Sequence, residues 1–155
     1  MKKVYLAGPC DSENRSLMVK VARVLKARGD MEVYCPFELK IPNAWDMSQE
    51  EWALQVFSAD LLKLENADIF IMISTGREST AGTNWEQGYA FARNKAIYVF
   101  QVTDKATSLM TYCGSHRFYN IKNEFDLYDY LREFSFPSDI SVDKNLRGLC
   151  RTVLT

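Results

Sequence analysis

The sequence lacks an excess of charge of either sign. Its 155 residues contain 19 Lys and Arg against 20 Asp and Glu, and no run of basic residues forms a stripe. A protein that binds nucleic acid through the backbone phosphates needs a positively charged surface. We therefore expect no nucleic-acid partner.

The sequence also has no long hydrophobic run, no CxxC motif and a single histidine, His116. The first apolar stretch, KKVYLAG, is too short for a signal peptide or a membrane span, so no membrane partner is expected. Four widely spaced cysteines beside one histidine argue against a zinc site, and no metal or cofactor is predicted. Scattered cysteines without a secretion signal favour reduced thiols in a cytoplasmic protein.

Strand-like and helix-like segments alternate along most of the chain. Short apolar runs predict strands at residues 3–6, 31–35, 67–73, 96–102 and 118–121, the last at an edge. Apolar periodicity predicts helices from about residue 12 to 28, from Ser48, and at 82–94, 108–112 and 123–134. The helix from Ser48 begins with a capping box to Glu51, and its residues expected to face a core are Trp52, Val56, Ala59 and Leu62.

This alternation predicts an α/β fold. We expect a doubly wound, mostly parallel sheet of about five strands with helices on both faces, of the flavodoxin-like or Rossmann-like kind. Residues 1–155 should form one domain, with a weakly patterned tail from about residue 137. Because ligands of such sheets bind beyond the carboxyl ends of the strands, three loops should meet at one edge: residues 8–12, 36–46 and 74–83.

The stretch STGRESTAGTNWEQGYA, residues 74–90, begins as a Gly/Ser/Thr-rich loop and ends as a helix. A Walker phosphate loop needs a Lys after its glycines, and this loop has none. The loop with Ser12 and Arg15, near a helix start, is a second phosphate-binding candidate. Glu86 has two interpretations. It completes a capping box with Thr83, or it lies in the first helical turn, where the helix dipole keeps it ionised and suited to act as a nucleophile.

Three motifs resemble the nucleoside 2-deoxyribosyltransferase family. They are YLAGP at residues 5–9, AD before an apolar strand at residue 67, and AGTNWEQGYAFARNKAIYVF at residues 81–100. The resemblance covers about residues 3–110, and the last motif is specific because an acid, glycines and an aromatic residue coincide in it. The wider superfamily also contains nucleotide N-glycosidases, which cleave nucleoside monophosphates with water.

The resemblance implies catalytic roles for three residues. Glu86 matches the nucleophile, which attacks C1′ of the deoxyribose, expels the base and forms a covalent deoxyribosyl–enzyme before a second base attacks with net retention. Tyr5 matches the tyrosine that hydrogen-bonds this carboxylate, the alternative being an ordinary core aromatic. Asp60 matches an acid near the nucleophile and the base, the alternative being a solvated helix position.

The motifs also supply candidates for substrate contacts. Gly8 and Pro9 belong to the first motif, and Gly82 and Thr83 belong to the last. Glycine at these positions would allow the backbone to approach a ligand closely, although turn formation explains it equally well.

Four more candidates come from two loops. Phe37 and Trp45 follow the second strand and could stack on the base or anchor their loop on the core. Ser108 and Met110 match a segment that, in the family, reaches the site of a neighbouring subunit. The resemblance therefore implies a homo-oligomer.

One departure from the family pattern affects the predicted activity. The family usually has an Asp six residues before the nucleophile, and this sequence has Thr80 there. Asp60 or Glu78 would then have to give a proton to the departing base. The leading prediction is transfer of 2-deoxyribose between nucleobases.

Two other functions remain open. The first is an N-glycosidase that hydrolyses deoxynucleoside 5′-monophosphates, with Ser12, Arg15 and Ser79 as phosphate donors and Thr80 as the feature in its favour. The second is a non-catalytic nucleotide sensor. In all three cases the expected partners are small nucleosides, nucleotides or nucleobases.

Overall fold

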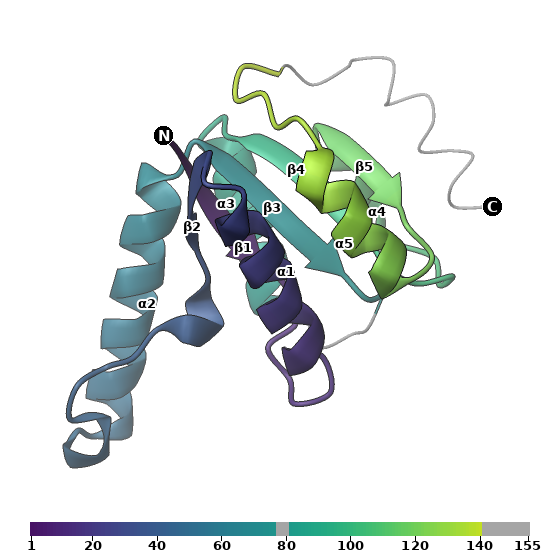
Figure 1. The fold of residues 1–155 in the computed structure, drawn as a ribbon. Helices are drawn as coiled ribbons and strands as arrows, with labels where there is room; N and C mark the ends of the chain where they lie inside the picture. The colour runs from purple at the N-terminus through teal and green to yellow at the C-terminus, as the bar shows by residue number, and fades with distance from the viewer. Residues whose placement is uncertain (77–80, 141–155) are drawn as a thin grey trace.

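Five parallel strands form the centre of the computed structural model, which describes residues 1–76 and 81–140 (Figure 1). The strands are β1 (Lys2–Ala7), β2 (Met31–Tyr34), β3 (Ile69–Ser74), β4 (Ala96–Gln101) and β5 (Arg117–Asn120). Their order across the sheet is β2-β1-β3-β4-β5, and every pairing is parallel. The predicted α/β fold is confirmed, and β5 lies at an edge as expected.

Helices cover both faces of this sheet (Figure 1). They are α1 (Arg15–Ala27), α2 (Gln49–Asn66), α3 (Ala81–Ala92), α4 (Leu109–Cys113) and α5 (Glu124–Glu133), with short 3-10 turns at Pro36–Glu38 and Ala44–Asp46. α1 and α5 lie on one face, and α2, α3 and α4 lie on the other. The candidate site is built on the second of these faces.

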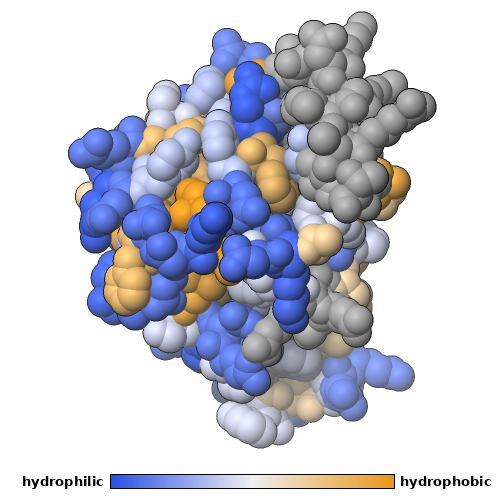
Figure 2. All heavy atoms as spheres, turned by 90° about the vertical axis from the view of Figure 1, so that its right-hand side faces the viewer, coloured by the Kyte–Doolittle hydropathy of each residue, from blue (hydrophilic) through white to orange (hydrophobic). Residues whose placement is uncertain are grey.

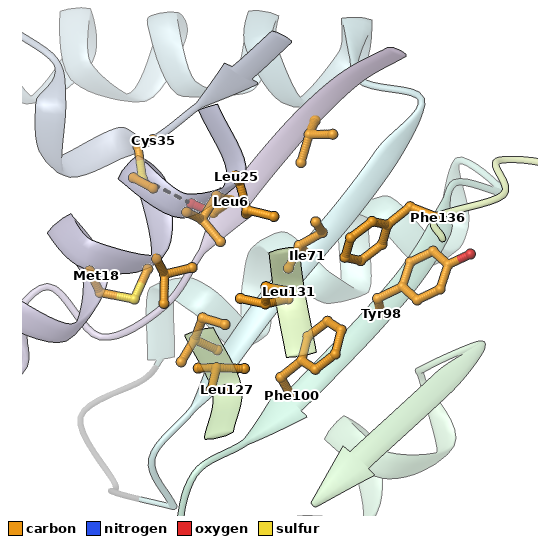
Figure 3. Packing of buried hydrophobic residues seen from close by; sticks show 14 of the residues in the cluster. Leu6, Met18, Leu25, Cys35, Ile71, Tyr98, Phe100, Leu127, Leu131 and Phe136 are labelled. Atoms are coloured by element: carbon orange, nitrogen blue, oxygen red, sulfur yellow. Dashed lines mark hydrogen bonds between the residues drawn. The ribbon is translucent and has the colours of Figure 1, made fainter. Parts of the chain in front are cut away.

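The larger core lies between the sheet and the pair α1 and α5 (Figure 3). Met18 and Leu25 of α1 and Leu131 of α5 pack onto strand residues such as Leu6 and Ile71, and all five are buried. The burial of so many aliphatic and aromatic side chains fixes the sheet from this side. The ends of its strands are therefore a rigid base for the loops that follow them.

The opposite face holds a smaller core with an aromatic centre. Tyr5 of β1 stacks on Phe70 of β3, with ring centroids 5.8 Å apart, and both rings are buried. Leu64 of α2 and Ala90 of α3 close this cluster from outside. Because β1 and β3 are neighbours, the pleat that buries Tyr5 also aims it toward the space between α2 and α3.

The start of α2 is as predicted, and its predicted core face is partly right, because Val56 and Ala59 are half-buried. The Ser48 hydroxyl accepts a hydrogen bond from the Glu51 backbone N–H, and the Glu51 side chain accepts one from Ser48, so the capping box is confirmed. Trp52 and Leu62, however, are 44% and 61% exposed, and Leu64 is the buried residue of the helix. α2 has apolar residues around much of its circumference, so periodicity could not select the side that faces the sheet.

Two smaller expectations also differ from the structure. The apolar periodicity that predicts a helix at 123–134 uses Phe125, Leu127, Tyr128 and Leu131 as core positions; Phe125 is largely exposed in α5, while the other three are buried. The cysteines are not all reduced. Cys10 and Cys35 are free thiols, but Cys113 is joined in a disulfide, so the prediction of reduced thiols is wrong for that residue.

Three features of the described residues bear on possible partners: membrane-spanning helices, groups of metal ligands and the polarity of the surface. No helix in residues 1–76 and 81–140 is long and apolar enough to cross a membrane. Within the same ranges, no three His, Cys, Asp or Glu side chains are grouped as a metal site would need. In Figure 2, the side at the right of Figure 1 faces the viewer. Hydrophilic residues predominate among its coloured atoms.

Candidate active site

Glu86 of α3 and Tyr5 of β1 form a direct contact at the centre of the site. The Tyr5 hydroxyl donates a hydrogen bond to Glu86 Oε1 over 2.7 Å, although the two residues are 81 positions apart in the chain. A hydrogen bond to a carboxylate is stronger than one between neutral groups and fixes its orientation. The pairing predicted for these two residues is therefore present in the fold.

A second pair of the same chemistry lies beside the first. The Tyr34 hydroxyl, at the end of β2, donates to Asp60 Oδ1 of α2 over 2.6 Å. The Tyr34 and Tyr5 rings are in contact, with centroids 5.5 Å apart. Glu86 and Asp60 consequently approach one region from α3 and α2, each held by a tyrosine of the sheet.

Two cavities flank Glu86. The first, here called the α2–α3 cavity, has a volume of about 290 Å³ and is lined mainly by apolar side chains, among them Phe57, Leu61 and Trp85. The second, the loop cavity, has a volume of about 210 Å³ and includes Phe37. Asp60, Gly82 and Glu86 line both cavities. Together the two spaces are of the size that small-molecule sites occupy.

The loop cavity forms where the three predicted loops meet. Gly8 and Cys10 follow β1, Pro36 and Phe37 follow β2, and Gly82 and Thr83 follow β3, and all of them line it. The loops after β1 and β2 therefore meet the first turn of α3 at the carboxyl edge of the sheet, as expected, while residues 77–80 of the third loop lie outside the described residues. An α/β sheet of this kind has its ligand crevice at that edge.

The two glycines of the site serve different purposes. A Cβ at Gly8 would lie 2.5 Å from the Met18 sulfur, so the glycine makes room for a side chain of α1. A Cβ at Gly82 would meet nothing within 4 Å, although Gly82 lines both cavities. Gly82 therefore leaves open space next to Glu86, as close approach of a ligand requires.

Burial sets the protonation of the two carboxyls. Burial raises the pKa of Glu86 to about 7, the hydrogen bond from Tyr5 opposes the rise, and the nearby Asp60 charge adds to it. Burial also raises the pKa of Asp60, with the Tyr34 hydrogen bond acting in the opposite direction. The pKa of Tyr5 lies far above its ordinary value, because its ring is buried and Glu86 is adjacent. Two carboxyls with raised pKa values in one cavity indicate a functional site.

The capping-box interpretation of Glu86 is wrong. Since α3 begins at Ala81, Thr83 lies inside the helix, and Glu86 lies in its second turn. The Thr83 hydroxyl donates to the Gly8 carbonyl over 3.1 Å and ties α3 to the loop after β1. Glu86 instead receives the Tyr5 hydroxyl. The expectation that the helix dipole keeps Glu86 ionised also fails, because burial raises its pKa more than any other effect.

Residues 4–145 match the family described as nucleoside 2-deoxyribosyltransferase, which is nearly the whole chain. The chain belongs to the nucleoside 2-deoxyribosyltransferase family. Membership points to an enzyme that acts on nucleosides or nucleotides. The match also extends beyond the three short motifs, to residues 4–145.

Solved structures of this fold include enzymes of two activities. A 2-deoxyribosyltransferase from Bacillus psychrosaccharolyticus is 26% identical, with a TM-score of 0.75 over 90% of this chain and 98% of its own. A CMP N-glycosidase from Clostridium botulinum is 21% identical, with a TM-score of 0.60 over 84% and 97%. A 2-deoxyribosyltransferase from Leishmania mexicana is 18% identical, with a TM-score of 0.52 over 99% and 98%. The last two show the fold alone. A search of curated proteins found no match.

Some predicted contact residues lie away from the two cavities of this family member. Trp45 is fully exposed, and neither cavity has it in its lining. Pro9 is buried beside Gly8. Ser108 and Met110 line a separate cavity of about 560 Å³ between α3 and α4, where the Ser108 hydroxyl caps α4. Thr80, Glu78 and Ser79 lie outside the described residues.

Sequence reasoning missed the apolar half of the site. Phe57, Asp60, Leu61 and Leu64 line the α2–α3 cavity and are spaced three, one and three residues apart, which is one face of a helix. Asp60 was predicted, and a helical pattern anchored on it would have found Phe57, Leu61 and Leu64. Tyr34 was missed too. It could have been found because it pairs with Tyr5 on the neighbouring strand and carries the same side chain.

Proposed function

We propose that the protein transfers 2-deoxyribose from one nucleobase to another through a covalent intermediate on Glu86. The observation that carries the proposal is the Glu86 carboxyl, hydrogen-bonded by Tyr5 and placed between two cavities. The 26% identity to a 2-deoxyribosyltransferase over nearly its full length supports the same activity.

The chemistry proceeds in two displacements. An ionised Glu86 oxygen attacks C1′, the bond from C1′ to the base nitrogen breaks, and the base leaves with the electron pair. The nitrogen of the second base then attacks C1′ and displaces Glu86, so the sugar configuration is retained. Tyr5 keeps the carboxylate oriented for both steps.

A proton must move in each displacement. The departing base takes one up at its nitrogen, and the incoming base releases one. Asp60 lines both cavities next to Glu86, and burial raises its pKa, as suits a group that must bind and release a proton. We assign the proton exchange to Asp60, in the role that the family pattern gives to an acid at position 80.

Hydrolysis of a deoxynucleoside 5′-monophosphate is the competing function. It requires donors for the phosphate, and the two predicted donors in the described residues, Ser12 and Arg15, are exposed and line neither cavity. Among the described residues, neither predicted phosphate donor lines the cavities, and this favours an uncharged nucleoside as the substrate. A sensor without activity has no use for an oriented carboxyl with a raised pKa, so it is the least supported function.

One assay with two arms tests these functions. In the first arm, the protein is incubated with a deoxynucleoside and a different free base; in the second, with a deoxynucleoside monophosphate alone. A new nucleoside in the first arm supports transfer. Free base in the second arm only would establish hydrolysis instead. If neither arm gives a product, the non-catalytic sensor is the remaining function.

A pair of variants links the activity to Glu86. Glu86→Ala should lower turnover by several orders of magnitude, as loss of a nucleophile does. Glu50→Ala, which alters an exposed glutamate in the first turn of α2, should behave like the unchanged protein. Near-normal turnover of Glu86→Ala would rule out the covalent route.

We also propose that the chain forms a homo-oligomer through the face around Met110. Met110 is 78% exposed, and it borders the cavity between α3 and α4 that has a largely apolar lining. Exposed apolar groups around a cavity are typical of contact surfaces. We expect the protein to form a homo-oligomer. Light scattering at micromolar concentration should give a molar mass that is a multiple of that of one chain. Met110→Glu should shift the protein to smaller species, and a monomer in the unchanged protein would contradict this part.

A further inference from the structure

Tyr34 stands in the same relation to Asp60 as Tyr5 does to Glu86. Tyr5 and Tyr34 are paired directly across the parallel strands β1 and β2. Paired residues of neighbouring strands project from the same face of a sheet. Each therefore directs its hydroxyl toward the helix layer, where it meets a different carboxyl: Glu86 at 2.7 Å and Asp60 at 2.6 Å.

The Tyr34 hydroxyl constrains Asp60 without taking part in the cavity lining. Asp60 lines both cavities, whereas Tyr34 is in the lining of neither. The bond occupies Oδ1 and fixes the plane of the carboxyl. Oδ2 is then the oxygen that a ligand in the cavities can meet. Without the hydroxyl, this restraint on rotation about the last bond of the Asp60 side chain is lost.

The Tyr34 ring is itself held on two sides. Its contact with the Tyr5 ring has a centroid separation of 5.5 Å and an interplanar angle of 43°. The ammonium group of Lys63, one turn after Asp60 on α2, lies 5.6 Å from the centroid of the Tyr34 ring. A hydroxyl on such a fixed ring can orient its acceptor, which a hydroxyl on a mobile side chain cannot.

We propose that Tyr34 is a positioning residue that fixes the Asp60 carboxyl against the two cavities, so that one tyrosine of the sheet orients each carboxyl of the site. This inference rests on the proposed function for its effect on turnover. Its structural part concerns only Asp60 and is testable without a substrate. Nothing in the family motifs above includes Tyr34.

The surroundings of Asp60 set the direction of the expected change. Burial raises the pKa of Asp60, and the Tyr34 bond is the effect that opposes it. The titratable and charged groups around Asp60 and its partner are Tyr34 of β2, Tyr5 of β1, Glu86 of α3, Cys10 after β1 and Lys63 of α2. Removal of the Tyr34 hydroxyl leaves all the others in place, so the pKa of Asp60 should rise.

The test compares Tyr34→Phe with a matched control. Tyr128→Phe removes a hydroxyl that donates to Glu124 within α5, on the opposite face of the sheet. Both variants keep the ring, so both should remain folded. The Asp60 carboxyl is followed by ¹³C NMR across pH and is assigned by the loss of its signal in Asp60→Asn. Turnover of a deoxynucleoside with a second base is measured on the same samples.

The expected results differ between the variants. In Tyr34→Phe, the Asp60 signal should titrate at a higher pH, by about one unit, and kcat should fall about tenfold, the size expected for one lost hydrogen bond to a charged group. Tyr128→Phe should match the unchanged protein in both respects. An unmoved Asp60 titration, or a moved titration with unchanged kcat, would refute the positioning role.

The same experiment separates this inference from the proposed function. If the unchanged protein converts no nucleoside, the proposed function fails, and the titration alone decides whether Tyr34 controls Asp60. If turnover is present but the titration does not respond to Tyr34→Phe, the inference fails while the proposed function stands.

Discussion

Replacement of Glu86 by glutamine should make the protein more stable at alkaline pH. The pKa of Glu86 rises from its ordinary value of 4.5 to about 7 because the carboxyl is buried. Between these two values the folded protein holds more protons than the unfolded chain. Stability from this group is therefore fully present below pH 4.5 and is lost as the pH rises through 7.

The size of the effect follows from the same change. Each tenfold change in proton affinity corresponds to about 1.4 kcal/mol, so a rise from 4.5 to about 7 amounts to about 3 kcal/mol. Glutamine keeps the shape of the side chain and can still accept the Tyr5 hydroxyl, but it has no charge to bury. At pH 8, Glu86→Gln should be more stable than the unchanged protein by about 3 kcal/mol, and at pH 5 by less than about 1 kcal/mol.

Urea unfolding followed by tryptophan fluorescence measures this directly. The free energy of unfolding is obtained at several pH values from 5 to 8 for the unchanged protein, Glu86→Gln and the control Glu50→Gln. The control replaces an exposed glutamate of α2 and should reproduce the pH dependence of the unchanged protein. If the curves for Glu86→Gln and the unchanged protein run parallel, burial does not govern the Glu86 carboxyl, and the electrostatic reasoning is refuted.

Two further changes follow from hydrogen bonds of the site. Tyr5→Phe removes the hydrogen bond that lowers the pKa of Glu86, so that pKa should rise further. The gain in unfolding free energy that Glu86→Gln brings at pH 8 should then be larger in the Tyr5→Phe background than in the unchanged protein. Turnover of Tyr5→Phe at pH 7 should fall about tenfold. Thr83→Val leaves the Gly8 carbonyl without its buried partner and should cost about 1–2 kcal/mol in urea unfolding; a loss below about 0.3 kcal/mol would show that this tie between α3 and the first loop is unimportant.

The parts of the site carried by local patterns could be predicted from the sequence. Strand and helix positions agree with the structure to within a few residues, because apolar runs and breakers determine them. Glu86 and Tyr5 were found because each lies in a short motif with several specific residues. The convergence of three loops followed from the parallel sheet, which brings all strand ends to one edge.

The parts that depend on packing between distant elements could not be predicted. The side of α2 that faces the sheet is decided by how Leu64 and Phe57 fit against β1 and α3, and the helix pattern alone left several sides equally apolar. The protonation of Glu86 is a competition between burial, a tyrosine from another element and Asp60. Each of these requires three-dimensional neighbours that spacing along the chain does not reveal.

The position of β1 in the sheet has a consequence for biosynthesis. β1 is made before the other strands of this sheet, yet it pairs with β3, whose partner residues begin at Ile69, and its Tyr5 bonds to a residue 81 positions later. One edge of β1 can pair with β2 early, but its other edge must wait until β3 has been made, which ends at Ser74 of the 155 residues. Parallel pairings over such distances form slowly and leave apolar strands open to other chains in the meantime. We expect a growing chain to acquire the carboxyl pair late, after α3 has been released.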